Sequence, residues 1–320
     1  MEIVKVTNLK KLYGEFPAVN EISFSIEQGE VFGFLGPNGA GKTSTIKMMI
    51  GLSRPTSGQI MIDGIDAIKD IKKVQKFIGI VPDENNLYAE MNGFDNLCFC
   101  ASLYGIGKAK REKRAMELLE QFNLTKAAKY PFKTYSKGMK RKLTIAAGII
   151  HNPKILFLDE PTTGIDVESA RQIRELILNL KKQGKTIFIT THYIEEAERI
   201  CDRIAFIVEG EIVKIGKVTE VLRDAEREHK IKLQLSSSIK NIKEELENNF
   251  INCKVKLLDE NSCLFISKEP IALFPILQLL DNTGISVYEA KELKPSLEEV
   301  FVKITNINPK TKNEQEKVGK

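Results

Sequence analysis

Apolar residues in the first 222 positions form two kinds of short run. In one kind every residue or nearly every residue is apolar, and in the other apolar residues alternate or mix with polar ones. Continuous runs, typical of strands buried on both faces of a parallel sheet, lie at residues 31–35, 77–81, 155–158, 187–190 and 204–208. The other runs, typical of antiparallel strands with one buried face, lie at residues 2–6, 22–26 and 59–62. Apolar positions spaced by three and four residues predict helices between the strands, as over 167–182. The pattern therefore predicts an α/β fold with a mixed, mostly parallel sheet and an antiparallel β subdomain.

Residues 86–150 interrupt this alternation, because they carry helical patterns but no strand pattern. The helices are expected at residues 94–104, 110–122 and 137–150. We therefore predict a helical subdomain at about 86–150, inserted in an α/β domain that spans residues 1–222.

The character of the chain changes after Leu222, where a charged stretch precedes a second series of elements. Strands are expected at 231–235, 254–258, 263–267 and 285–289, and helices at 239–250 and 271–282. The order β-α-β-β-α-β suggests a small ferredoxin-like α+β module with its helices on one face of the sheet. We predict this accessory domain at 231–304, including a last helix over 296–304, and expect the polar tail 305–320 to be disordered.

Composition adds few constraints. Hydrophobic residues make up 42% and charged residues 28% of the chain, and the net charge of +5 is mild. The five scattered cysteines fit a reducing compartment without a disulfide framework. No apolar stretch approaches the roughly 20 residues of a membrane span, and the first residues lack a secretory signal pattern. Basic residues are predicted to form solvated helix faces rather than nucleic-acid patches at 108–114 and at Lys137, Lys140, Arg141 and Lys142.

One segment carries a specific chemical signal, because it fits G-x-x-x-x-G-K-[ST] between a predicted strand and a predicted helix. It reads Gly36-Pro37-Asn38-Gly39-Ala40-Gly41-Lys42-Thr43, followed by Ser44. Such a loop curls so that its N–H groups and the positive end of the next helix converge on phosphate oxygens. Lys42 is expected to bridge the β- and γ-phosphates, and the Thr43 hydroxyl to hold Mg²⁺. The chain is therefore predicted to bind a nucleoside triphosphate.

A second signal is the run Ile155-Leu156-Phe157-Leu158-Asp159-Glu160, four apolar residues that end in two carboxylates. A buried parallel strand would deliver both carboxylates to the sheet edge where the phosphate loop lies. We expect Asp159 to reach Mg²⁺ through water and Glu160 to act as general base on the attacking water.

The first 222 residues, which contain both of these signals, resemble the ATP-binding-cassette (ABC) ATPases. Tyr135-Ser136-Lys137-Gly138-Met139 is similar to the family's signature, usually LSGGQ. The resemblance implies that Ser136, Gly138 and Met139 bind the γ-phosphate of an ATP held by a partner subunit. It also implies a D-loop aspartate at Asp166, a switch histidine at His192 and adenine stacking on Tyr13.

Two departures from the family pattern stand out. The Q-loop glutamine is expected after Ile80-Val81-Pro82, but this chain has Asp83 there. A shorter, charged side chain could approach Mg²⁺ directly or through water. The signature has Lys137 and Met139 where glycine and glutamine are usual, and activity is expected to be kept because the backbone donors remain.

The end of the chain indicates a branch of the family. The segment Lys294-Pro295-Ser296-Leu297-Glu298-Glu299-Val300-Phe301 resembles the ATPase subunits of bacterial exporters that use a separate membrane subunit. This resemblance implies a head-to-tail homodimer, or a heterodimer with a similar ATPase, with ATP and Mg²⁺ as cofactors. It also implies an integral membrane permease partner and a peripheral position on the cytoplasmic face of the cell membrane.

Two other hypotheses remain open. One is a non-transport ABC ATPase that acts on nucleic acid or the ribosome, although no nucleic-acid partner is expected. The strands at 231–235 and 254–258 lack the interleaved aromatics that stack bases, and residues 43–136 contain no long coiled coil. The other hypothesis makes the accessory domain a ligand sensor or dimerisation domain that regulates the ATPase. The transported substrate cannot be deduced from this chain.

Overall fold

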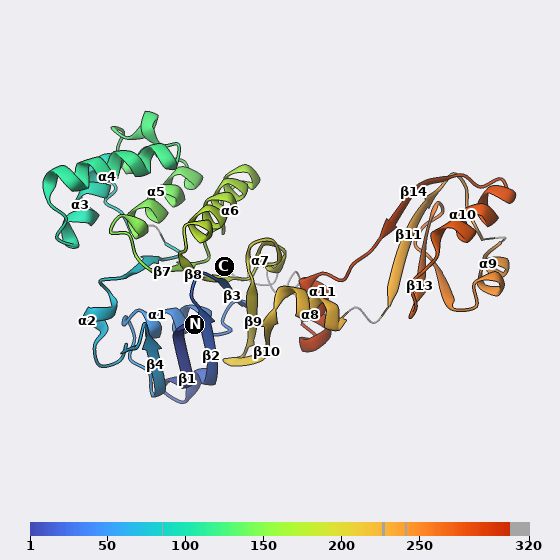
Figure 1. The fold of residues 1–320 in the computed structure, drawn as a ribbon, viewed down its shortest axis with the longest axis horizontal. Helices are drawn as coiled ribbons and strands as arrows, with labels where there is room; N and C mark the ends of the chain where they lie inside the picture. Colours follow the sequence, from blue (N-terminus) through green and yellow to red (C-terminus); the bar gives the residue numbers. More distant parts are fainter. Residues whose placement is uncertain (85, 226–227, 241, 308–320) are drawn as a thin grey trace. The chain divides into compact units, whose positions relative to one another are not determined.

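The computed structural model describes residues 1–84, 86–225, 228–240 and 242–307. Its backbone groups into two compact units, one comprising Met1–Val218 with the chain from Phe301 onward and the other Thr219–Val300 (Figure 1). Unit 2 is therefore formed by a continuous segment, and the residues that follow it belong to unit 1 again. The predicted disordered tail, 305–320, lies almost entirely outside the described residues.

A six-stranded sheet forms the centre of unit 1, in the order β10-β9-β3-β8-β7-β6. Its strands are β3 (Val31–Leu35), β6 (Ile78–Val81), β7 (Ile155–Asp159), β8 (Thr186–Thr191), β9 (Arg203–Val208) and β10 (Glu211–Lys217). The first five pair in parallel, and β10 pairs antiparallel with β9. The five continuous apolar runs of the sequence account for the parallel strands. The edge strand β10 escaped prediction because its residues alternate between exposed and half-buried positions.

A second sheet of unit 1 has the order β2-β1-β4-β5 and is antiparallel. Its strands are β1 (Glu2–Tyr13), β2 (Phe16–Glu27), β4 (Ser57–Ile62) and β5 (Ile65–Asp66). The first two are much longer than predicted, because register shifts and positive φ angles at Asn8 (46°) and Glu21 (54°) let the pairing continue through bends. These irregularities break the simple alternation on which the prediction rested.

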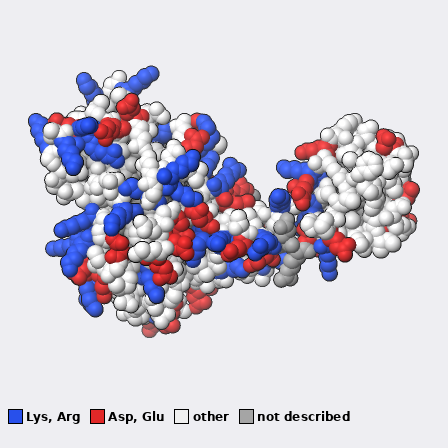
Figure 2. All heavy atoms as spheres, viewed as in Figure 1, with Lys and Arg blue, Asp and Glu red and all other residues white. Residues whose placement is uncertain are grey.

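The helices of unit 1 include the predicted helical insertion. They are α1 (Lys42–Met49), α2 (Ile71–Val74), α3 (Gly93–Leu103), α4 (Lys108–Gln121), α5 (Lys137–Ile149), α6 (Val167–Lys182) and α7 (Ile194–Ile200), with 3₁₀ turns at Thr125–Ala127 and Phe132–Thr134. Figure 2 shows Lys and Arg side chains gathering over the helical insertion, where the segment 108–114 is largely exposed as predicted.

The core of unit 1 joins the two sheets through a cluster of aromatic rings. Phe24 of the antiparallel sheet lies 5.5 to 6.1 Å, between ring centroids, from Phe32, Phe34 and Phe188 of the central sheet. Phe157 contacts Phe188 at 5.8 Å. The residues at the carboxyl ends of β3, β7 and β8 are thus held by a densely packed interior.

Unit 2 has the predicted element order. Its sheet, β12-β13-β11-β14, is antiparallel throughout. The elements from its beginning to the return into unit 1 are α8 (Val218–Ala225), β11 (His229–Leu235), α9 (Lys243–Asn249), β12 (Cys253–Leu257), β13 (Ser262–Ser267), α10 (Leu273–Asn282), β14 (Val287–Glu292) and α11 (Leu297–Thr305). Buried residues of β11, β12 and β13 pack with residues of α9 and α10 in a separate hydrophobic core. Phe301, where the chain returns, meets Phe206 of unit 1 with ring centroids 5.2 Å apart.

Candidate nucleotide-binding site

The phosphate loop connects β3 to α1, as the sequence predicts. A side chain at Gly36 would place its Cβ 2.1 Å from the carbonyl oxygen of Ile207, so the strand β9 approaches too closely for any other residue. Gly41 has a φ of 102° and begins the helix from the left-handed region, which favours glycine. These two positions let the loop fold back over the amino end of α1, and the first N–H groups of a helix are suited to bind an anion.

Lys42 occupies the centre of the loop and is only 5% exposed. Its Nζ donates hydrogen bonds to the carbonyl oxygens of Gly36 (2.8 Å) and Pro37 (3.1 Å). It also lies 3.4 Å from Oε1 of Glu160. Burial lowers the pKa of Lys42, while the Glu160 and Asp159 carboxylates oppose that shift. The ammonium group is therefore preorganised among oxygens that a phosphate could replace.

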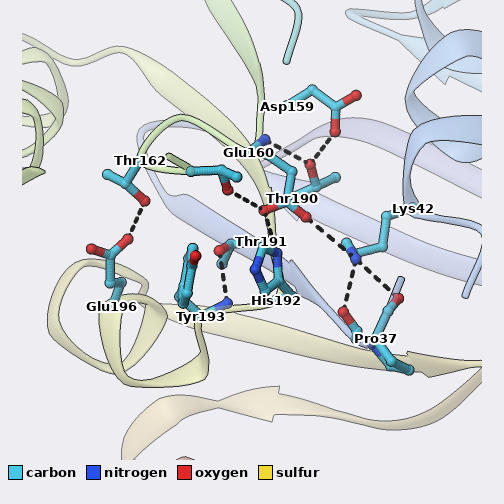
Figure 3. Close-up of polar contacts among 12 residues, drawn as sticks. Pro37, Lys42, Asp159, Glu160, Thr162, Thr190, Thr191, His192, Tyr193 and Glu196 are labelled. Carbon is cyan, nitrogen blue, oxygen red and sulfur yellow. Dashed lines mark hydrogen bonds and ion pairs between the residues drawn. The ribbon is translucent and has the colours of Figure 1, made fainter. Parts of the chain in front are cut away.

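Glu160 lies between Lys42 and His192 (Figure 3). Its Oε2 is 2.9 Å from Nδ1 of His192 and accepts a hydrogen bond from the Thr163 hydroxyl at 3.0 Å. Burial favours the neutral acid, but the His192 hydrogen bond and the Lys42 charge outweigh it, so the pKa of Glu160 lies below its usual value. The backbone of Glu160 has a φ of 47°, a rare conformation for a residue with a side chain. The site thus holds an ionised carboxylate in a strained and specific orientation.

Asp159 ends β7 beside the phosphate loop. Its Oδ1 accepts a hydrogen bond from the Thr190 hydroxyl at 2.5 Å, and the Thr43 hydroxyl lies 3.5 Å from the same oxygen. A carboxylate and a hydroxyl are hard oxygen donors, the kind that Mg²⁺ prefers. No group of three or more His, Cys, Asp or Glu side chains suited to a metal occurs among the residues the structure describes. A site with only one or two protein ligands suits Mg²⁺, because this ion usually keeps several waters and also binds substrate phosphates.

Lys42, Glu160 and His192 line a cavity of about 450 Å³ in unit 1, whereas Asp159 lines a neighbouring cavity. The lining of the first cavity comprises Tyr13, Phe16, Ala18, Asn38, Gly39, Gly41, Lys42, Thr43, Ser44, Asp83, Glu160, Thr163 and His192. Tyr13 and Phe16 are 51% and 63% exposed at the turn between β1 and β2, so both rings are accessible. Phe16 was not anticipated from the sequence, although an exposed aromatic three residues after Tyr13 in the same turn was the available signal.

Asp83 lies at the edge of this cavity on the segment that follows β6. Burial raises the pKa of its carboxyl group and the Asp159 and Glu160 charges add to the shift, against the nearby Arg141. The departure at this position therefore places a further acidic group near Asp159 and Glu160.

The signature residues lie outside this cavity. The Ser136 hydroxyl caps α5 by accepting a hydrogen bond from the Met139 N–H at 3.2 Å. Gly138 packs so closely on α6 that a Cβ there would lie 2.2 Å from the hydroxyl oxygen of Ser169. Asp166 caps α6 through the Ser169 N–H at 2.8 Å. One chain thus brings Ser136, Gly138, Met139 and Asp166 close to one another but does not line its own phosphate cavity with them.

The prediction that Arg141 belongs to a solvated helix face is wrong, because this side chain is only 4% exposed. Arg141 shares a buried face of α5 with Gly138, Ile145 and Gly148. That spacing of three, four and three residues was the signal in the sequence. Burial lowers the pKa of Arg141 to about 10, with Asp83, Asp159 and Glu160 opposing the shift, so the guanidinium stays charged at neutral pH.

Comparison with known proteins identifies the family. Residues 19–163 match the family model described as ABC transporter. The linearmycin resistance ATP-binding protein LnrL of Bacillus subtilis (strain 168) is 44% identical over 219 residues, which cover 68% of this chain and 70% of LnrL. The chain belongs to the ABC transporter ATP-binding proteins. The ABC transporter ATP-binding protein YhcH of Bacillus subtilis (strain 168) is 32% identical over 95% of this chain and 96% of its own length, so that similarity includes unit 2.

Solved structures agree with this assignment. The structure of an ATP-binding subunit of an ABC transporter is 29% identical, with a TM-score of 0.64 over 70% of this chain and 93% of that chain. The cassette MJ0796, described as dimeric in a post-hydrolysis state with ADP and Pi, is 28% identical with a TM-score of 0.63 over 67% of this chain and 98% of its own. These comparisons confirm the predicted family, the cassette fold and the ATPase activity. As a member of this family, the chain binds ATP. No helix in the described parts of the chain combines the length and the apolar character needed to cross a bilayer.

Proposed function

We propose that this ABC ATPase hydrolyses ATP to drive export through a separate membrane subunit. The observation that carries the proposal is Glu160, held between Lys42 and His192 at the wall of the phosphate-loop cavity. Relatives named for linearmycin resistance, for Nod factor export in Ralstonia nicotianae and for doxorubicin resistance in Mycobacterium tuberculosis support the direction of transport. The compounds in their names differ, so we propose that the membrane subunit determines which substrate is exported.

In the proposed mechanism the phosphate loop from Gly36 to Ser44 binds the triphosphate. Lys42 exchanges its carbonyl contacts for β- and γ-phosphate oxygens, and Tyr13 stacks on the adenine ring. Phe16, equally accessible at the same turn, adds apolar surface beside it. The cavity of about 450 Å³ is of the size that encloses small ligands.

Glu160 is proposed as the general base for the attacking water. Its ionised carboxylate can accept the proton of that water, and His192 orients it through the 2.9 Å contact to Nδ1. His192 can then contact the γ-phosphate with the ring nitrogen that Glu160 does not hold. Thr43 and Asp159, with Asp83 nearby, would hold Mg²⁺, which neutralises charge on the phosphates during transfer.

The signature residues are proposed to complete the site of a second subunit. Ser136, Gly138 and Met139 begin a helix whose amino end suits an anion, and Asp166 lies beside them. Because they do not line the cavity of their own chain, a head-to-tail dimer, homomeric or with a similar ATPase, would bring them to the partner's ATP.

The membrane subunit is proposed to dock in a second cavity of unit 1, of about 460 Å³, between the α/β core and the helical insertion. Its walls include Leu52, Tyr88, Phe99, Leu103 and Tyr104. Such an apolar groove suits a short amphipathic helix of a permease. The chain would then lie on the cytoplasmic face of the cell membrane as a peripheral subunit.

Two variants test this function. Glu160→Gln should keep ATP binding, abolish hydrolysis and accumulate as an ATP-bound dimer in size-exclusion chromatography. Glu117→Gln, an exposed change on α4, should behave as the unmodified chain. A Glu160→Gln protein that hydrolyses ATP at the normal rate would overturn the assignment of the base, and one that stays monomeric with ATP would overturn the dimer.

Lys42→Ala should abolish nucleotide binding, measured by calorimetry, and unchanged affinity would contradict the phosphate-loop assignment.

The nucleic-acid alternative would be revived by salt-dependent binding of RNA or DNA to the full chain. Deletion of residues 231–320, followed by dimerisation and ATPase assays, tests a regulatory role for the accessory domain.

A further inference from the structure

Within the described parts of the chain, the guanidinium group of Arg141 donates hydrogen bonds to backbone carbonyls of two other segments. Its Nε donates to the Pro161 carbonyl at 3.0 Å and its Nη2 to the Asp159 carbonyl at 2.5 Å. Its Nη1 donates to the Asp83 carbonyl at 3.2 Å and to the Pro82 carbonyl. One side chain of α5 therefore joins the helix that carries the signature, the segment of Asp83 and the turn of Glu160.

The carbonyls of Asp159 and Pro161 lie on either side of Glu160 in the chain. Glu160 has a φ of 47°, a strained left-handed conformation that persists only where the surrounding structure holds it. Arg141 bonds the carbonyl of the residue before Glu160 and the carbonyl of the residue after it. The planar, five-donor fork of arginine is suited to spanning several acceptors at once, which the compact ammonium of lysine is not.

We propose that Arg141 is a positioning residue for ATP hydrolysis: it holds the left-handed turn that aims the Glu160 carboxylate and ties that turn to α5 and to the Asp83 segment. A shift of α5, whose amino end carries the signature, would then pull on the turn of Glu160 and change the aim of the base. This inference rests on the proposed role of Glu160 as general base. Asp83 contributes its carbonyl to the link and its negative charge to balance the buried guanidinium.

The test compares Arg141→Lys with the matched change Arg114→Lys on α4, where Arg114 contacts Glu117 at 3.4 Å in an exposed pair. Arg141→Lys keeps the charge but cannot span the four carbonyls. We expect its kcat for ATP to fall about 10- to 100-fold, the usual effect of a slightly misplaced catalytic group. The KM and the calorimetric Kd for ATP should change less than about threefold, because Arg141 does not line the phosphate cavity. Arg114→Lys should change neither parameter.

Hydrogen exchange supplies a readout that hydrolysis does not. Backbone amides of residues 160–164 should exchange faster in full-length Arg141→Lys than in the unmodified chain, with the phosphate loop unaffected. Should Arg141→Lys fold poorly, Arg141→Gln, which buries no charge, takes its place in both measurements. Normal kcat in a folded variant overturns the proposal, as does an equal loss of kcat and ATP affinity, which would indicate a general structural defect. Normal hydrolysis by Glu160→Gln would instead refute the proposed function, whatever the Arg141 variants do.

Discussion

Thr190 of β8 offers a sharp test of how the site is stabilised. Its side chain is fully buried, and its hydroxyl donates to Oδ1 of Asp159 at 2.5 Å. The Glu160 N–H reaches the same hydroxyl at 3.2 Å, but it also donates to the Thr190 carbonyl at 3.1 Å. Thr190→Val keeps the shape of the side chain and leaves the Glu160 N–H satisfied. What the variant loses is the hydrogen bond to a buried carboxylate.

A hydrogen bond to a charged group contributes about 1.5–3 kcal/mol to the free energy of unfolding. Asp159 is only 6% exposed, so water does not readily replace the lost donor. For a domain of this size each kcal/mol lowers the melting temperature by roughly 2–4 °C. Thr190→Val should therefore melt about 3–12 °C below the unmodified chain.

The assay is thermal unfolding of the full chain followed by circular dichroism, without nucleotide or Mg²⁺. Thr190→Ser is the control, because it keeps the hydroxyl and loses one methyl group, which contributes about 1 kcal/mol in a packed core. Thr190→Val should melt below Thr190→Ser. A melting temperature of Thr190→Val within about 1 °C of the unmodified chain, or above that of Thr190→Ser, would refute the reasoning.

Three further predictions concern packing and charge. Gly36→Ala would drive a Cβ to 2.1 Å from the Ile207 carbonyl, so it should melt far below Gly107→Ala, whose Cβ would meet nothing within 4 Å; equal melting temperatures would contradict this. Phe188→Ala empties the centre of the aromatic cluster and should lower the free energy of unfolding by about 3–5 kcal/mol in urea titrations, which a shift below about 1 kcal/mol would disprove. The pKa of Glu160 lies below its ordinary 4.5, so its stabilising contribution is complete above pH 4.5 and is lost as the pH falls through the native value. As the pH falls below 4.5, the melting temperature of Glu160→Gln should therefore decrease less than that of the unmodified chain. Parallel plots of melting temperature against pH for the two proteins would exclude the effect.

The phosphate loop and the strand that precedes Glu160 could be predicted because each is a local sequence pattern that serves one kind of chemistry. A continuous apolar run marks a strand buried on both faces, and polar residues directly after it must lie at the sheet edge. Chain order alone therefore indicated that Lys42 and Glu160 are neighbours, and they lie 3.4 Å apart. The long strands β1 and β2 were underestimated because their bends at Asn8 and Glu21 interrupt the alternation.

The case of Arg141 shows where local patterns fail. Neighbouring Lys140 and Lys142 suggested a solvated basic face, yet the helix rotates Arg141 inward onto the turn of Glu160. Burial of a charge is decided by what packs against it, and here the acceptors come from Pro82 and Pro161, 59 and 20 residues away in the chain.

By itself, the sequence determined the family, the loop that binds phosphate and the carboxylates beside it, because these depend on residue types at short, regular spacings. Only the tertiary structure decided how Glu160 is held: Lys42 and His192 contact its carboxylate, and Arg141 bonds the carbonyls of the residues before and after it. The physical reason is that an orientation depends on hydrogen bonds and burial among segments distant in sequence. The same packing leaves the signature residues outside the cavity of their own chain, which is the basis for proposing a second subunit.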